Sequence, residues 1–314
     1  MAGRLRIPID MHDLIRDLRF TLRMWRQHPG FIAVALLSLA LGIGANTSIF
    51  SLMDALIFRP LPVQQPEQLV LLGRGQGSGI TGSFPNRETV AYSQPFLESL
   101  RARNQVFASV AGIESMRADI HGRFEGDSSS EAAPLKIRVV SGNYFSMLGV
   151  GPAAGRVLTA ADDQKPGASP VAVMSYALWQ RRFSRDARIV GRAVTFNNTA
   201  FTIIGVASRK FTGTMLDESP DLWIPLSMQA QVQPDIDDPR GALTQSLWIM
   251  ARLKPEVSRT AAQVNANIVF QQWLHEIAGP KPSPAREEDM RNARVVLTDV
   301  GTAYHSCARI SPML

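Results

Sequence analysis

The run from Phe31 to Met53 constrains this chain most, because its 23 consecutive residues carry no charged side chain. Eleven of them are Phe, Ile, Val or Leu. A helix of that length extends about 35 Å, and the hydrocarbon core of a bilayer is about 30 Å thick. The run therefore predicts a transmembrane helix, which we place at residues 31–58.

A cleaved secretory signal is the alternative interpretation, since it also sets an apolar run behind basic residues. The apolar part of a signal is about 7 to 15 residues long. The run here is longer, and 30 residues precede it. Both observations favour a span that stays in the mature protein.

Arginines flank this run unequally. Arg16, Arg19, Arg23 and Arg26 lie within 20 residues before it, and Arg59 is alone within 20 residues after it. Positive residues beside a span stay in the cytoplasm. We therefore expect a single pass through the cytoplasmic (inner) membrane, with the N-terminus inside and the rest of the chain periplasmic or extracellular.

Residues 1–30 are predicted to form a cytoplasmic amphipathic segment. Leu14, Leu18 and Leu22 recur every four residues with Trp25 beside them, and arginines occupy the other face. This pattern is typical of a helix that lies along the inner leaflet and contacts membrane lipid. Pro29 and Gly30 are expected to end it.

Small residues recur within the predicted span. Ala40, Gly44 and Ser48 are spaced four residues apart, which would allow another membrane helix to approach closely. Glycine is also simply more common in membrane helices. The pattern thus leaves helix packing and ordinary composition both open.

Residues 59–301 show mixed patterns typical of an α+β fold. These roughly 240 residues suit one large domain or two small ones, and two are favoured. The paired Asn197 and Asn198 predict a tight hairpin. Expected strands are 68–72, 136–140, 171–174, 193–196, 201–206, 222–224 and 247–253, and expected helices are 143–148, 176–183 and one with an apolar stripe of Val257, Ala261, Val264 and Ile268.

The net charge of +6 does not indicate nucleic-acid binding, because residues 1–30 carry six arginines and three aspartates and thus half of the excess. The next densest group, Arg181, Arg182, Arg185 and Arg188, is interpreted as a solvated helix face. No nucleic-acid motif accompanies it. A nucleic-acid partner is therefore not expected.

No pattern of catalytic, cofactor-binding or metal-ligating residues is found. Five histidines are scattered, and the single Cys307 has no partner for a disulfide. Gly77 to Gly82 matches G-x-G-x-x-G, but nearby prolines disfavour the helix that a nucleotide site needs. The acid pairs Asp162-Asp163 and Asp237-Asp238 are interpreted as solvated loops. We therefore expect no enzymatic activity and no cofactor.

Several separated motifs resemble the MacB-like permeases, especially the duplicated orphan permease type. The resemblance covers about residues 11–300. Its N-terminal motifs are Leu18-Arg19-Phe20, His28-Pro29-Gly30-Phe31, Ala40-Leu41-Gly42-Ile43-Gly44-Ala45-Asn46-Thr47 and Phe58-Arg59-Pro60-Leu61-Pro62. Those that resemble a MacB-type periplasmic core domain are Val140-Ser141-Gly142-Asn143-Tyr144-Phe145, Val171-Ala172-Val173-Met174, Ile203-Ile204-Gly205-Val206 and Asp221-Leu222-Trp223-Ile224-Pro225-Leu226.

This resemblance implies a two-lobed α+β extracytoplasmic domain carried on stalk-like membrane helices. It implies a permease subunit, FtsX-like, of an ABC-type exporter or mechanotransmission system. The expected partners are a separate ATPase subunit and further permease helices, in a homo- or hetero-oligomer. The chain itself contains no ATPase motif.

The end of the chain departs from this family, whose members continue into further spans. Residues 302–314 form an atypical tail without an apolar run. A truncated or frameshifted permease and a genuine short end are both open hypotheses. A single helix cannot enclose a transport path, so the alternative function is a single-pass, membrane-anchored binding or interaction module. An anchored enzyme is the least favoured interpretation.

Overall fold

The computed structural model describes residues 29–53, 62–73, 91–115, 118–126, 132–214, 219–236, 238, 240–242 and 244–300. The chain divides into two compact units, Met1–Arg59 and Pro60–Leu314, and each is described by itself. The predicted inner-leaflet residues Leu14, Leu18, Leu22 and Trp25 lie outside the described residues. So do the glycine motif at 77–82 and the tail at 302–314.

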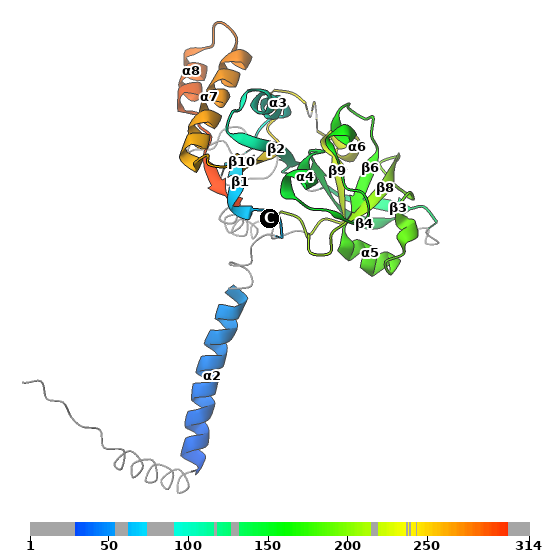
Figure 1. Cartoon of the computed structure of the whole chain (residues 1–314), viewed down its shortest axis with the longest axis vertical. Coiled ribbons are helices and arrows are strands. Elements are labelled where there is room, and N and C mark those ends of the chain that lie inside the picture. Colours follow the sequence, from blue (N-terminus) through cyan, green and yellow to red (C-terminus); the bar gives the residue numbers. More distant parts are fainter. Residues whose placement is uncertain are drawn as a thin grey trace, which may run out of the picture. The chain divides into compact units, whose positions relative to one another are not determined.

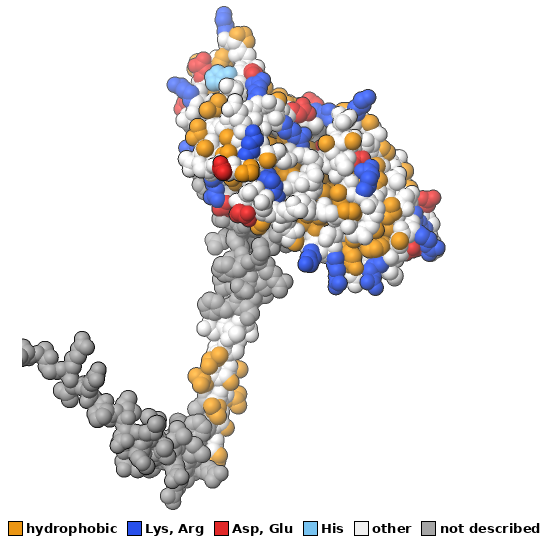
Figure 2. Space-filling model, in the orientation of Figure 1, with side chains coloured by type: hydrophobic (Ala, Val, Ile, Leu, Met, Phe, Trp, Pro, Cys, Tyr) orange, Lys and Arg blue, Asp and Glu red, His pale blue; other side chains and the backbone are white. Residues whose placement is uncertain are grey.

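In the first unit the described element is helix α2, Pro29–Met53 (Figure 1). It begins two residues before the predicted span, because proline is well tolerated at the first position of a helix. The large apolar side chains that the structure describes between Val34 and Ile43 of α2 are more than half exposed, including Leu37 at 67% and Leu41 at 71%. Figure 2 shows hydrophobic side chains along the described part of this helix. Within the described residues, none of the helices combines the length and the apolar character that crossing a membrane requires.

The second unit is built on one mixed sheet. Within the described residues the strands are β1 (Leu69–Leu72), β2 (Phe107–Glu114), β3 (Ala118–Phe124), β4 (Ala133–Val140), β5 (Pro152–Gly155), β6 (Val171–Met174), β7 (Ala193–Phe196), β8 (Thr199–Ala207), β9 (Leu222–Pro225), β10 (Leu247–Leu253) and β11 (Leu297–Asp299). They follow the order β11-β1-β10-β2-β4-β3-β7-β8-β6-β9, and β5 pairs with β8. Strands far apart in sequence are thus neighbours in the sheet (Figure 1).

The sheet has two halves. In the first half β11, β1, β10 and β2 are antiparallel neighbours. The second half consists of six strands in the order β4-β3-β7-β8-β6-β9. A parallel pairing of β4 with β9 closes these strands into a ring. In the described residues the backbone pairing between β2 and β4 consists of Ile113 opposite Val140. The described strands of the unit Pro60–Leu314 therefore form two halves of one sheet.

Helices cover the sheet and complete the core. They are α3 (Gln94–Arg103), α4 (Tyr144–Leu148), α5 (Tyr176–Phe183), α6 (Gln229–Val232), α7 (Arg259–Ala278) and α8 (Pro284–Asn292), with 3-10 turns η2 (Pro66–Gln68), η3 (Ala160–Asp163), η4 (Ala187–Ile189) and η5 (Leu226–Met228). Helices α3 and α7 pack through Phe96, whose ring centre is 5.0 Å from that of Phe270. Successive strand residues belong to two different apolar clusters, for example Val70 and Leu71. Strands β1, β9 and β10 are thus buried on both faces, whereas β3 alternates buried and exposed residues.

Short elements agree closely with the sequence pattern. Strands β6, β7 and β10 and helix α5 have the predicted bounds. Asn197 and Asn198 have positive φ angles of 47° and 59°, as the predicted hairpin between β7 and β8 requires.

The helix predicted from the apolar stripe is present as α7, but the stripe does not face the core. Val264 and Ile268 are 56% and 52% exposed. The helix instead buries the opposite face, where aromatic residues add more area than the aliphatic stripe could. The buried residues of α7 are Ala262, Ala266, Val269, Phe270, Trp273 and Leu274.

Candidate functional site

The junction of the two sheet halves is held by polar contacts rather than by an extended strand ladder. Ser141 directly follows β4, and its backbone N–H donates to the carbonyl of Gly112 over 2.8 Å. The Ser141 Oγ accepts the N–H of Gly112, also over 2.8 Å. The serine side chain thus replaces a backbone group in the contact between β2 and the turn after β4.

The side chain of Arg101, in α3, forms hydrogen bonds to the same turn. Its Nη2 donates to Ser141 Oγ over 2.9 Å and to Asn143 Oδ1 over 3.1 Å, and its Nε donates to the carbonyl of Val110. Burial lowers the pKa of Arg101, and the nearby charge of Asp163 opposes that shift. The guanidinium therefore joins α3 and β2 of the first half to the turn that leads into α4.

Asp163 connects this turn to the η5 segment. Its carboxylate accepts the backbone N–H of Gly142 over 2.9 Å and that of Ser227 over 2.7 Å. Burial raises the pKa of Asp163, although both N–H groups and the Arg101 charge favour the ionised form. A carboxylate that accepts two backbone donors orders two loops at once.

Asp162 has a different role, and the interpretation of this acid pair as a solvated loop is wrong. Arg156 donates to both oxygens of Asp162, over 2.7 and 2.8 Å. Thr159 completes a capping box with Asp162 at the start of η3. The hydrogen bonds from Arg156 lower the pKa of Asp162. Of the other acid pair, only Asp238 is described, and its backbone carbonyl accepts the N–H of Gly241.

Gly142 is required by a close approach. A Cβ atom at this position would lie 2.4 Å from the carbonyl oxygen of Thr159 and 2.7 Å from the Cβ of Asp163. Contacts this short do not occur in real structures. The resemblance pointed to Ser141, Gly142 and Asn143 as a motif, but sequence reasoning missed their shared role because their partners are distant in the chain.

A second polar cluster lies at the buried side of the junction. Glu114 ends β2, is fully buried, and accepts hydrogen bonds from Ser246 Oγ at 2.9 Å and from Gln229 Nε2. Arg138 of β4 donates to the carbonyl of Glu114 over 2.8 Å and stacks 5.8 Å from the ring centre of Trp248. Both halves of the sheet contribute to this cluster, so it restrains their relative position.

Arg252 of β10 forms hydrogen bonds to the segment at 62–68, which is the first described part of the second unit. It donates to the carbonyls of Gln64, Gln65 and Met147 over 2.6, 3.1 and 2.9 Å. Gln64 in turn donates its N–H to the carbonyl of Leu148 over 2.9 Å. The beginning of this unit is therefore tied both to β10 in the first half and to α4, which follows the junction.

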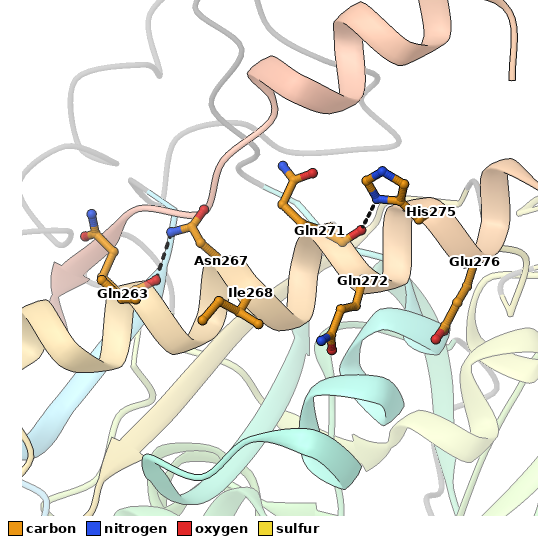
Figure 3. A pocket seen from close by; sticks show the side chains of 8 residues that line it. Gln263, Asn267, Ile268, Gln271, Gln272, His275 and Glu276 are labelled. Carbon is orange, nitrogen blue, oxygen red and sulfur yellow. Dashed lines mark hydrogen bonds between the residues drawn. The ribbon is translucent and has the colours of Figure 1, made fainter.

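An open groove of about 750 Å³ runs along the exposed side of α7 (Figure 3). Its lining residues are Gln263, Val264, Asn267, Ile268, Gln271, Gln272, His275 and Glu276. Asn267 and Gln271 donate to the carbonyls of Val295 and Met290, so these two amides hold the chain around α8 against α7. The apolar side chains of Val264 and Ile268 are 56% and 52% exposed among these lining residues.

The remaining predicted residues take no part in the junction. Ala40, Gly44 and Ser48 are exposed on α2, and a Cβ on Gly44 would contact no described atom within 4 Å. Their role in helix packing stays a prediction. In the basic group, Arg181 pairs with Asp221 at 3.0 Å and Arg188 with Asp186 at 2.8 Å.

Metal-ligating side chains do not gather in the described ranges, where no three His, Cys, Asp or Glu residues are placed to hold an ion. The expectation that the protein is not an enzyme remains a prediction.

The chain matches the family model of the MacB-like periplasmic core domain over residues 32–267. The solved periplasmic region of MacB from Actinobacillus actinomycetemcomitans is similar in fold, with a TM-score of 0.51 and 16% identity. That match covers 80% of this chain and 96% of the MacB region. A search of curated protein sequences finds no match.

Two further solved structures align at lower TM-scores. One is a domain described as a permease protein's from Porphyromonas gingivalis, with 16% identity, a TM-score of 0.46, and coverage of 80% of this chain and 96% of that one. The other is the extracellular domain of the noncanonic ABC-type transporter YknZ from Gram-positive bacteria. It has 10% identity, a TM-score of 0.46, and coverage of 73% of this chain and 99% of that one.

The fold defines an α+β domain of the extracytoplasmic class, with two half-sheets joined by a polar junction. Since the family model matches well over half of the residues, the chain belongs to the MacB-like periplasmic core domain family of ABC transporter permeases. The resemblance seen in the sequence motifs is thereby confirmed.

Proposed function

We propose that this chain is a permease subunit of an ABC-type exporter or mechanotransmission system, contributing one membrane span and the extracytoplasmic core. Membership of the MacB-like family is the observation that carries this proposal. ATP hydrolysis would come from a separate ATPase subunit, and membership of a family of ABC transporter permeases supports such a partner. The chain itself would make and break no bonds.

The proposed span is the uncharged run at residues 31–53, oriented with the N-terminus in the cytoplasm. It is supported by the length of the run and by the excess of arginine on its N-terminal side. Exposed leucines on α2 add support, because burying such side chains in lipid is favourable. Ala40, Gly44 and Ser48 would contact further permease helices.

The mechanical role proposed for the core depends on the segment at 62–68. A displacement of the membrane helix would reach the core through this segment, which Arg252 and Gln64 fasten to β10 and α4. From α4 the displacement would pass through Ser141 and Asp163 to both halves of the sheet. Buried polar contacts suit this role because they switch between discrete arrangements and do not deform gradually.

The alternative function is a membrane-anchored interaction module that works without transport. The open face of α7 favours it, since an exposed apolar helix face is typical of an interaction surface. This alternative predicts a stable complex that contains no ATPase.

The test is purification of the tagged full chain from its native membrane, followed by measurement of ATP hydrolysis in the complex. We expect an ATPase subunit to co-purify and nucleotide to change the protection of residues 62–68 from hydrogen exchange. Arg252→Ala should abolish that change, whereas Lys254→Ala, which removes a single contact to the carbonyl of Gln105, should preserve it. A complex without ATPase activity would contradict the proposal.

A further inference from the structure

A cavity of about 210 Å³ lies where the two halves of the sheet meet, apart from the groove on α7. Gln94, the first residue of α3, contributes to it from the first half. Gln229 and Gln231 contribute from α6, which follows β9 of the second half. Drug-sized ligands occupy pockets of about 300 to 1,000 Å³, so this smaller cavity suits a small molecule.

Three amide side chains, those of Gln94, Gln229 and Gln231, line the cavity. The first two are hydrogen bonded within the fold, because Gln94 Nε2 donates to Glu98 and Gln229 Nε2 donates to the buried Glu114. The Oε1 of Gln231 is also buried, but no hydrogen-bond donor among the described residues reaches it. A buried acceptor without a donor is costly, so this oxygen favours a ligand that carries an N–H group.

Two opposite charges line the same cavity. Asp238 and Arg240 are both exposed, and within the described part of the chain neither side chain forms an ion pair or a hydrogen bond. They lie in one turn, in which the carbonyl of Asp238 accepts the N–H of Gly241 over 2.8 Å. An ammonium group complements the carboxylate of Asp238, and a carboxylate complements the planar guanidinium of Arg240.

We propose that this cavity binds a small zwitterion with a side-chain amide, of the size and chemistry of L-glutamine. Its ammonium group pairs with Asp238, its carboxylate pairs with Arg240, and its amide N–H donates to Oε1 of Gln231. Both charged groups of a free amino acid are used. A residue inside a peptide has neither charge, so it does not satisfy the site.

The bound zwitterion contacts both halves of the sheet and so restrains the junction. On one side it meets α3 at Gln94, and on the other it meets α6, where Gln229 also binds Glu114. Binding in the cavity requires neither an ATPase nor a membrane helix. A failure of this inference therefore leaves the proposed function unaffected.

The test is a ligand-observed NMR titration of the full chain in detergent with L-glutamine. We expect saturable binding with a dissociation constant of about 0.1 to 1 mM, which is within the range for a ligand of about ten non-hydrogen atoms. Two analogues each lack one charge. Glutaramic acid, without the amino group, and 4-aminobutanamide, without the carboxylate, should each bind about tenfold more weakly because each loses one charge-assisted contact.

Substitutions assign each charge to its partner. Asp238→Asn should weaken binding of L-glutamine about tenfold and leave that of glutaramic acid unchanged, because this analogue has no ammonium group. Asp235→Asn, which changes an exposed carboxylate outside the cavity, should have no effect. Arg240→Gln should weaken binding of L-glutamine but not of 4-aminobutanamide, and Arg291→Gln on α8 is its control.

Two results would overturn the inference. One is the absence of saturable L-glutamine binding by a chain that unfolds cooperatively on heating. The other is equal affinity of the Asp238→Asn and Asp235→Asn chains for L-glutamine, which would place the binding elsewhere. Hydrogen exchange locates the site independently, since L-glutamine should protect residues 226–231 and leave α7 unchanged.

Discussion

The carboxylate of Asp163 accepts a hydrogen bond of 2.9 Å from the backbone N–H of Gly142. This contact holds the turn after β4, at the point where the two halves of the sheet meet. The other oxygen of Asp163 binds the N–H of Ser227, so one side chain fixes two loops. The junction is therefore determined by contacts between residues 21 and 64 positions apart.

Asp163→Ala is expected to lower the free energy of unfolding by about 2 to 6 kcal/mol, because two buried N–H groups lose their acceptor at about 1 to 3 kcal/mol each. Chemical denaturation of the full chain in detergent measures this. Asp235→Ala removes an exposed carboxylate and should change stability by less than about 0.5 kcal/mol. Equal effects of both variants would contradict the role of Asp163.

Arg156→Ala should make stability less dependent on acid pH. Arg156 lowers the pKa of Asp162 in the folded state, so the stabilisation is complete above the unfolded pKa of about 4 and is lost as pH falls through the folded pKa. Denaturation midpoints between about pH 6 and 2 should thus converge for wild type and variant. Asp163 has a raised pKa and acts with the opposite sign, but it is present in both chains. A constant difference at all pH values would contradict this account.

Gly142→Ala should destabilise the fold by about 1 to 3 kcal/mol through overpacking against Thr159. The matched control is Gly151→Ala, since a Cβ at Gly151 would meet no described atom within 4 Å. Thermal unfolding of the two variants provides the measurement. Similar melting temperatures for both would show that the turn can move away from the added methyl group.

Phe270→Ala and Ile268→Gln test which face of α7 is buried. Phe270 is 2% exposed and contacts Tyr92 and Phe96, so its truncation should cost about 3 to 5 kcal/mol. Ile268 is 52% exposed, and its replacement should change the stability of a single chain by less than about 0.5 kcal/mol. Denaturation in detergent at low protein concentration compares them. A larger loss of stability from Ile268→Gln than from Phe270→Ala would indicate that the stripe predicted from the sequence is the buried face.

Local patterns in the sequence predicted the short elements well. Strand β6 is a continuous apolar run, and Asn197 with Asn198 determines the hairpin between β7 and β8 through backbone preference alone. The face of α7 was not predictable, because alanines and aromatics at 262, 266, 270 and 273 compete with the aliphatic residues at 264 and 268 for burial. Which side is buried depends on α3, whose Phe96 contacts α7 from more than 160 residues away.

The candidate site was predictable only in part. The resemblance identified Ser141, Gly142 and Asn143, yet the role of Gly142 depends on Thr159 and Asp163, which approach it only in the folded chain. The aspartate pair looked solvated because glycine and proline surround it. Asp163 is instead surrounded by η5 and Arg101, which no spacing rule connects to it.

The most direct test of the central claim is the membrane orientation of the full chain in intact cells. Gly3→Cys and Ala177→Cys are placed separately in the Cys307→Ser chain and treated with a membrane-impermeant maleimide. We predict that Ala177→Cys is labelled in cells whose outer envelope is permeabilised, and that Gly3→Cys is labelled only after lysis of the inner membrane. Labelling in the reverse order, or recovery of a soluble chain that lacks residues 31–53, would contradict the account.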